Sequence, residues 1–183
     1  MARLALAVCA AFLLPSEEFS QTRSEEYKLK AMYLRVIPSF VEWPASAGNA
    51  GKAAFLLCTV GYYPFGTRLA MEVQSVTVGG RKIELRLLRI GQELDACEVV
   101  FLGESEAKHY GQILESLKGK SVLTVGEDKG FLEAGGMVEL NFENGKLEME
   151  VNLVAARKAN LKVDARLLAM AKRVITEQGT SGG

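Results

Sequence analysis

The sequence predicts a single-domain α/β sandwich with a mainly parallel central sheet, an antiparallel hairpin and flanking helices. Its length of 183 residues suits one domain of ordinary size. Apolar runs as long as a strand alternate along the chain with segments whose apolar residues recur every three or four positions. Near the C-terminus, Asn144-Gly145 separates two segments of alternating polarity, which is typical of a tight hairpin. Strands that alternate with helices favour a parallel sheet covered by crossover helices.

The first helix of this domain is predicted to begin at Ser24. Ser24 is a good N-cap residue, and Glu25 and Glu26 complement the positive end of a helix dipole. The apolar side chains that follow lie three and four positions apart: Leu29, Met32, Tyr33, Val36 and Ile37. Pro38 then ends or kinks the helix, because proline cannot donate the backbone hydrogen bond that a helix interior needs.

The rest of the domain alternates strands, helices and turns. Apolar runs that predict strands buried on both faces cover residues 53–60, 97–102 and 121–125. Short helices are predicted over 65–73 and 104–117, and two strands over 75–78 and 82–90 flank a glycine turn. The hairpin covers 137–142 and 146–151, and helices over 153–159 and 164–176 follow it. The domain therefore spans 24–176, and the polar residues 177–183 are expected to form a flexible tail.

Residues 1–20 have the pattern of a secretory signal peptide. Arg3 precedes an apolar run over residues 4–14, which Pro15 ends. The run is too short to span a bilayer. We therefore expect export, cleavage near Ser20 and no membrane insertion of the processed protein. A buried N-terminal helix and a lipoprotein processed at Cys9 are the alternatives.

Removal of the signal peptide would take Cys9 with it and leave Cys58 and Cys97. In an oxidising compartment such a pair tends to form a disulfide. The closed loop would then stabilise the fold by roughly 3 to 4 kcal/mol in the chain-entropy account. Two buried free thiols are the alternative, because cysteine is often found inside proteins.

The composition argues against several function classes. Lysine and arginine total 22 and aspartate and glutamate total 22, which is unlike a general nucleic-acid binder. A single histidine, His109, and three cysteines without metal-ligand spacing do not make a zinc site. We expect His109 on an exposed helix surface. The sequence gives no reason to expect a metal or another cofactor.

The sequence shows no recognisable arrangement of catalytic residues either. Glycines after the strand over 121–125 match no phosphate-binding motif, and a turn followed by the start of the hairpin explains them better. Glu127 and Asp128 are adjacent, so their side chains are expected to point apart rather than to share one proton. Because no nucleophile motif is present, we do not expect an enzyme.

Several blocks of sequence, taken in order from about residue 25 to residue 175, resemble the YfiR-like family of small exported bacterial proteins. These blocks cover residues 27–34, 40–44, 55–61, 64–66, 97–102, 122–125, 131, 135–137, 150–153, 155–156, 161 and 167–171. The resemblance implies a periplasmic regulator of the Gram-negative type. Such a regulator binds the periplasmic portion of an inner-membrane diguanylate cyclase and holds it inactive, which lowers cyclic di-GMP signalling.

The resemblance also implies homodimers and a structural role for the pair Cys58 and Cys97. Some relatives carry a second cysteine pair nearer the C-terminus, and this chain has none. Redox switching through such a second pair is therefore not implied for this chain.

Four residues are candidates for binding the partner. Trp43 precedes Pro44 and can either anchor a partner or lie half-buried against the core. Asn152 fits an N-cap of the next helix and borders the predicted binding face. Glu148 and Glu150 alternate with apolar residues and so share one face of the hairpin. That face is either a solvated acidic surface or, as the resemblance favours, a partner-binding surface.

A small-molecule sensor is the alternative function. In a parallel sheet, ligands bind beside the carboxyl ends of the strands where the strand order reverses. The predicted strand ends near Gly61, Gly103 and Gly126 would form such a pocket, and a separate receptor would read the result.

Overall fold

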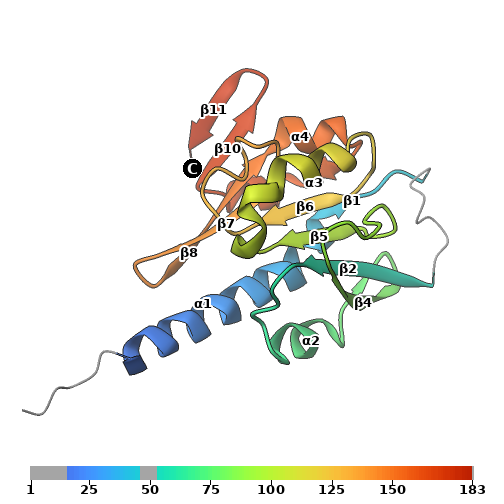
Figure 1. Cartoon of the computed structure of the whole chain (residues 1–183). Helices are drawn as coiled ribbons and strands as arrows, with labels where there is room; N and C mark the ends of the chain where they lie inside the picture. Colours follow the sequence, from blue (N-terminus) through green and yellow to red (C-terminus); the bar gives the residue numbers. More distant parts are fainter. Residues whose placement is uncertain (1–15, 46–52, 183) are drawn as a thin grey trace, which may run out of the picture.

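The computed structural model describes residues 16–45 and 53–182, which include a nine-stranded sheet (Figure 1). Its strands are, along the chain, β2 (Ala54–Val60), β3 (Thr77–Val78), β4 (Arg81–Leu88), β5 (Val99–Leu102), β6 (Leu123–Gly126), β7 (Val138–Glu143), β8 (Lys146–Asn152), β10 (Arg173–Thr176) and β11 (Gly179–Gly182). In space their order is β11-β10-β8-β7-β6-β5-β2-β4-β3. A separate antiparallel pair joins β1 (Val41–Glu42) to β9 (Lys162–Val163).

Five consecutive strands of the sheet, β7, β6, β5, β2 and β4, are parallel, as the alternation of strands and helices predicts. β2 pairs with β4 on one side and with β5 on the other, and β6 and β7 continue from β5. β7 and β8 form the predicted antiparallel hairpin, and Asn144 and Gly145 at its turn both have positive φ. The α/β sandwich with a mainly parallel sheet is confirmed.

Helices cover both faces of this sheet. They are α1 (Ser16–Val36), the 3-10 turn η1 (Ile37–Phe40), α2 (Arg68–Val73), the 3-10 turn η2 (Glu104–His109), α3 (Tyr110–Ser116), α4 (Leu153–Lys158) and α5 (Ala165–Ala169). α1 and α2 lie on one side of the sheet and α3 lies on the other (Figure 1). In the described part of the chain, no helix has both the length and the apolar character needed to cross a bilayer.

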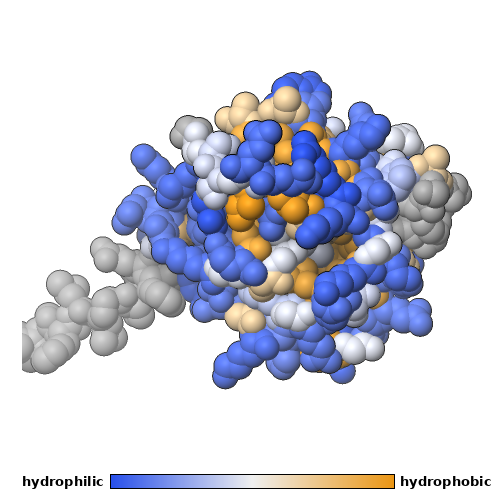
Figure 2. All heavy atoms as spheres, turned by 90° about the horizontal axis from the view of Figure 1, so that it is seen from above, coloured by the Kyte–Doolittle hydropathy of each residue, from blue (hydrophilic) through white to orange (hydrophobic). Residues whose placement is uncertain are grey.

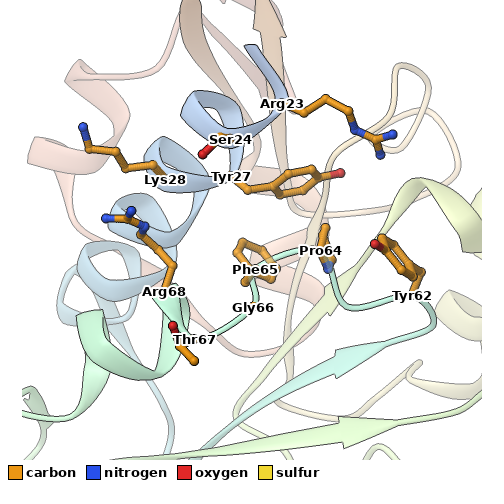
Figure 3. A pocket seen from close by; sticks show the side chains of 10 residues that line it. All are labelled: Arg23, Ser24, Tyr27, Lys28, Tyr62, Pro64, Phe65, Gly66, Thr67 and Arg68. Carbon is orange, nitrogen blue, oxygen red and sulfur yellow. The ribbon is translucent and has the colours of Figure 1, made fainter. Parts of the chain in front are cut away.

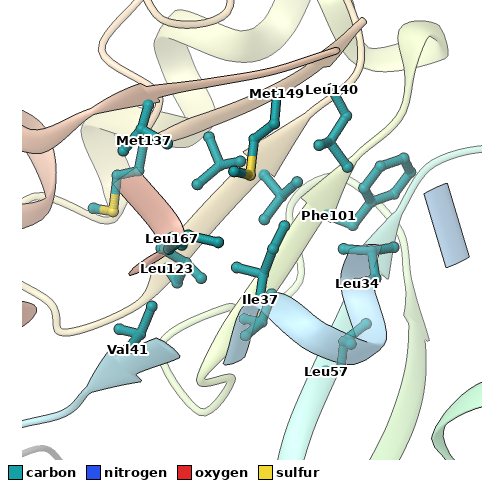
Figure 4. Packing of buried hydrophobic residues seen from close by; sticks show 14 of the residues in the cluster. Leu34, Ile37, Val41, Leu57, Phe101, Leu123, Met137, Leu140, Met149 and Leu167 are labelled. Carbon is teal, nitrogen blue, oxygen red and sulfur yellow. The ribbon is translucent and has the colours of Figure 1, made fainter. Parts of the chain in front are cut away.

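Two hydrophobic clusters, one on each face, explain the unbroken apolar strands. On the α1 side, Leu34 and Ile37 pack with Leu57 of β2, Phe101 of β5 and Leu123 of β6 (Figure 4). The cluster on the α3 side takes the alternate strand residues, and its members include Leu56, Cys58, Val100, Leu102 and Ile113. Because both faces are covered, successive residues of one strand are all buried, on one face and the other in turn. Burying one such leucine or phenylalanine side chain contributes about 1.5 to 3 kcal/mol.

The buried face of α1 differs from the apolar stripe predicted for it. Met32 of that stripe is 41% exposed. The side chains that α1 and the start of η1 bury are Tyr27, Lys30, Ala31, Leu34 and Ile37. Lys30 lies in the middle of this face. Because lysine is charged, the spacing of apolar residues alone does not predict that this face is buried. The helix also begins at Ser16, earlier than the predicted Ser24.

The C-terminal segment differs from its prediction as well. The helix expected over 164–176 ends at Ala169, and Arg173–Thr176 forms β10 beside β8. Val174, Ile175 and Thr176 are β-branched and favour a strand over a helix. The expected flexible tail over 177–183 contains β11, which pairs antiparallel with β10. Of the predicted signal peptide, residues 1–15 lie outside the described residues.

Candidate functional site

Three of the four predicted partner-binding residues lie in one row on β8. Met149 and Val151 of β8 point into the core on the α1 side. Because side chains alternate along a strand, Glu148, Glu150 and Asn152 point to the opposite face, which carries α3. The structure therefore brings these three residues together, as the hairpin pattern predicts.

The two glutamates of this row are not an unpaired acidic surface. Arg173 of β10 lies directly opposite Glu150 in the strand register, and its Nε donates to the Glu150 carboxylate. Arg173 also donates to Glu133 at 3.0 Å. Lys172 forms the equivalent ion pair with Glu148. The Glu150 side chain is only 13% exposed, and its carboxylate is paired with Arg173 within the fold.

Asn152 ends the row and caps the next helix, as predicted. Its Oδ1 accepts the backbone N–H of Ala155 at 3.0 Å, which satisfies one of the free donors at the start of α4. Its Nδ2 donates to the carbonyl of Leu132 at 3.4 Å. Asn152 thereby fixes the start of α4 against the loop between β6 and β7.

A groove of about 440 Å³ opens between α3 and α4, next to Asn152. Its apolar lining includes Leu114, Leu117, Met137, Val154, Ala155 and Ile175, and its charged lining residues are Glu115, Lys118 and Lys158. In the view from above Figure 1, hydrophobic residues gather near the middle of the face and hydrophilic residues surround them (Figure 2). An apolar centre inside a polar rim is the usual anatomy of a protein-binding surface.

Trp43 lies away from this row and has a packing role. Its ring meets Phe55 at the start of β2 edge-on, with ring centroids 5.1 Å apart. It is partly buried and packs against the larger hydrophobic cluster. Of the two roles that the sequence leaves open, the half-buried core role is the one that this geometry matches.

The predicted disulfide is present in the structure. Cys58 of β2 and Cys97, just before β5, are bonded, and both residues are buried. The bond links two neighbouring parallel strands at the centre of the sheet on the α3 side.

A second site lies at the carboxyl ends of the parallel strands, and the residue at its centre, Lys30, is one that the sequence analysis did not single out. Lys30 of α1 is buried, and its Nζ lies 2.6 Å from Oε2 of Glu127, directly after β6. Glu26 forms a second ion pair with Lys30. Oε1 of Glu127 accepts the backbone N–H of Glu104 at 2.8 Å and the hydroxyl of Tyr27 at 3.3 Å. Glu127 therefore joins α1, β6 and η2.

Cavities open beside Glu127, where the alternative function places a ligand pocket. After β2 the chain runs through α2 to β4 on one side, and then returns to β5 on the other side, so the strand order reverses between β2 and β5. A cavity of about 310 Å³ lies at this point and is lined by Tyr62, Gly103, Ser105 and Glu127, among others. A larger cavity of about 520 Å³ adjoins it between α1 and the loop before α2 (Figure 3).

The remaining chemical candidates have structural explanations. His109 is exposed, as expected, and its Nδ1 lies 3.4 Å from Glu106. Gly130 and Gly135 have positive φ in the turns before the hairpin. Within residues 16–45 and 53–182, no group of three or more histidine, cysteine, aspartate or glutamate residues is placed to hold a metal ion.

Comparison with known protein families gives a match over residues 27–172. The matched span begins in α1 at Tyr27 and continues past α5. It includes both cysteines of the disulfide, the β7–β8 hairpin and the groove between α3 and α4 except for Ile175. The chain belongs to the YfiR/HmsC-like family.

Proposed function

We propose that this chain is a periplasmic regulator that binds and inhibits the periplasmic portion of an inner-membrane diguanylate cyclase. Cyclic di-GMP signalling is low while the complex persists and rises on release. The observation that carries this proposal is the family match over residues 27–172, which covers most of the chain. In this proposal the chain acts by binding a protein and not by catalysis.

The groove between α3 and α4 is the surface that suits such a partner best. Its apolar lining offers a place for one or two apolar side chains of the cyclase, and Glu115, Lys118 and Lys158 supply charges of both signs. Apolar contacts of this kind supply most of the affinity, while charges at the rim guide orientation. Asn152 lines the groove, and Glu148 and Glu150 extend the same face along β8.

A test compares two substitutions of apolar residues by arginine. Val154→Arg places a charge in the groove, whereas Met71→Arg alters an exposed methionine of α2 that is 62% exposed. Deletion of the gene should raise cellular cyclic di-GMP and adhesion. Val154→Arg should raise them towards the level of the deletion, and Met71→Arg should not. Unchanged cyclic di-GMP after deletion would refute the regulator; an effect of deletion without an effect of Val154→Arg would refute only the groove.

The acidic row needs a different test, because Glu150 is paired. Glu150→Lys would place a lysine opposite Arg173 and lose an ion pair inside the fold. A loss of function could then reflect instability. The swapped pair Glu150→Lys/Arg173→Glu keeps opposite charges at the two positions. If Glu150 contacts the cyclase, both the single variant and the swapped pair release it; if only the single variant does, Glu150 acts through the fold.

Export and dimer formation are parts of the same proposal. Protein recovered from the periplasm should lack the first 16 to 25 residues. A measurement of the intact mass would show this loss. Such cleavage keeps all the buried side chains of α1 from Tyr27 onward. Recovery of the full chain only from the cytoplasm would contradict export. Light scattering on the processed protein tests the expected homodimer.

A further inference from the structure

In the described part of the chain, the strand β4 has no neighbouring strand along most of its outer edge. β4 lies near the margin of the sheet, beyond β2 (Figure 1). β3 pairs with its outer edge only at Arg81 and Lys82. The N–H of the next residue, Ile83, donates to the carbonyl of Val76 at 3.4 Å. The remaining residues, Glu84–Leu88, form an open stretch that we call the β4 edge.

The backbone groups of Leu85 and Leu87 point outward at the β4 edge. In a strand, the N–H and C=O of one residue point to the same side, and successive residues alternate between the two sides. The N–H of Ile83 points outward, towards β3, whereas the carbonyl of Leu88 accepts the N–H of Gly61 on the β2 side at 3.2 Å. Leu85 and Leu87 share the orientation of Ile83. Both residues therefore offer a donor and an acceptor to a further strand.

The side chains of the β4 edge are apolar on one face of the sheet and charged on the other. Leu85 packs partly against the cluster on the α1 side, and Leu87, which points the same way, is 61% exposed. Glu84 and Arg86 lie on the α3 side, and both side chains are exposed. An exposed leucine beside open backbone groups favours a further strand as the neighbour of β4.

We propose that a second copy of this chain adds its own β4 to this edge, antiparallel and around a two-fold axis. The inference rests on the homodimer of the proposed function and names its interface. The edge pairs with itself most completely when its middle residue, Arg86, faces Arg86 of the second copy. Leu85 then lies opposite Leu87 of the second copy, and the reverse. Each of these two leucine pairs exchanges backbone hydrogen bonds.

The neighbouring segments limit the pairing to this register. Moving the axis to Leu85 would place Leu87 of the second copy opposite Ile83, where Val76 already lies. Moving the axis to Leu87 would place Leu85 opposite Arg89, which lies beyond the end of β4. Both shifts lose leucine pairs that the register centred on Arg86 keeps.

The charges near the axis balance between the two copies. Two arginines directly opposite each other repel. However, Glu84 of each copy lies diagonally across from Arg86 of the other, within reach of long side chains. Within one chain the two groups are already 3.5 Å apart. The two glutamates and two arginines therefore form one cluster without net charge, and the opposed leucines cover the exposed surface of Leu87 on the other face.

This interface can be tested apart from the groove proposed for the cyclase. As far as the chain is described, the lining of that groove includes no residue of β4. The measurements below use the processed protein alone. A monomer in light scattering would overturn this interface and the homodimer, but it would leave the proposed regulator untouched.

Cysteine trapping on a non-reducing gel tests the register. Opposite residues at a two-fold axis of this kind have Cα atoms about 4.5 Å apart, which a disulfide can bridge. Arg86→Cys should therefore yield a covalent dimer that reductant separates. Lys82→Cys, on the same strand and face, is the matched control, because its two copies would lie about 27 Å apart. Equal cross-linking of the two variants would overturn the pairing.

A charge substitution then tests the leucine contact. Leu87→Lys should raise the dissociation constant of the dimer at least about tenfold, because it places a charge against Leu85 of the second copy. Met170→Lys, at a methionine that is 51% exposed after α5, should leave the dimer intact. An unchanged melting temperature shows that each variant is folded. A dimer that persists in Leu87→Lys and does not cross-link through Arg86→Cys would show that another surface joins the copies.

Discussion

Nζ of Lys30 lies 2.6 Å from Oε2 of Glu127 and joins the first helix to the carboxyl end of β6. The two side chains are 2% and 3% exposed. A buried charge is costly unless a partner and hydrogen bonds compensate it. Here Glu26 adds a second carboxylate to Lys30, and the backbone N–H of Glu104 adds a donor to Glu127. The pair therefore fixes how α1 lies on the sheet and positions one wall of the carboxyl-edge cavities.

Removing one partner of this pair should destabilise the protein more than removing both. Lys30→Met leaves Glu127 without its cation and should lower the free energy of unfolding by about 3 to 5 kcal/mol. In Lys30→Met/Glu127→Gln, the neutral amide can still accept the Glu104 N–H, so part of the loss should be recovered. Urea unfolding of the two single variants and the double variant measures the coupling. Losses that simply add would contradict the pairing.

Two buried tyrosines predict a loss of stability in alkaline solution. Burial raises the pKa of Tyr27 and of Tyr110 well above their ordinary value of 10.0. Above about pH 10 the unfolded chain loses these protons while the folded protein keeps them, so unfolding becomes more favourable as the pH rises. Each such tyrosine lowers the free energy of unfolding by up to about 1.4 kcal/mol per pH unit.

Urea unfolding between pH 9 and pH 11.5 measures this slope. Tyr110→Phe should flatten it, because phenylalanine has no proton to lose. Tyr62→Phe, at a position that is 67% exposed, is the matched control and should leave the slope as it is. An equal slope in the unmodified protein and in Tyr110→Phe would show that other groups cause the alkaline loss.

The Cys58–Cys97 disulfide should stabilise the folded protein against unfolding. It closes a loop with a sequence separation of 39, for which the chain-entropy account gives about 4 kcal/mol of stabilisation. Reduction should therefore lower the melting temperature, and Cys58→Ala/Cys97→Ala should melt at a low temperature whether or not reductant is present. Below that temperature, binding of the proposed cyclase partner should persist. Two freely alkylated thiols in the exported protein would contradict the disulfide.

The features that the sequence alone predicts correctly are those that depend on residues close together in the sequence. The strands with unbroken apolar runs, the Asn144-Gly145 hairpin and the Asn152 cap all depend on residues a few positions apart. The sequence does not predict β10, because a strand of this length after a short helix is too short to show a clear alternation of polar and apolar residues. Its β-branched residues become a strand since β8 offers an open edge beside them.

The ion pairs at both candidate sites could not be predicted in this way. Lys30 and Glu127 are 97 positions apart, and Arg173 and Glu150 are 23 positions apart. A lysine on a helix face normally indicates that this face is exposed to solvent. The sequence therefore predicts an exposed face where α1 in fact buries Lys30. Only the fold brings Glu127 to that lysine. The likeness to a known family identified the function class, whereas the pairing of charges needed the structure.

The glycine-rich stretch before the hairpin leads to a test of packing. The ring of Phe131 is fully buried and lies so close to Gly136 that a Cβ at that position would overlap it. Gly126, at the end of β6, meets the same ring. Gly136→Ala should therefore lower the free energy of unfolding by about 1 to 3 kcal/mol, because an added methyl group overpacks the core.

Two further variants separate overpacking from the general effect of replacing glycine. Phe131→Leu replaces the ring by a smaller side chain, so Gly136→Ala should cost less stability in a Phe131→Leu background than in the unmodified protein. Gly111 in α3 has open space around its Cβ position. Gly111→Ala should thus stabilise the helix by up to about 1 kcal/mol, since alanine has the higher helix propensity. Urea unfolding measures all four variants, and a loss at Gly136 that does not depend on residue 131 would show that the backbone there, and not the ring, requires glycine.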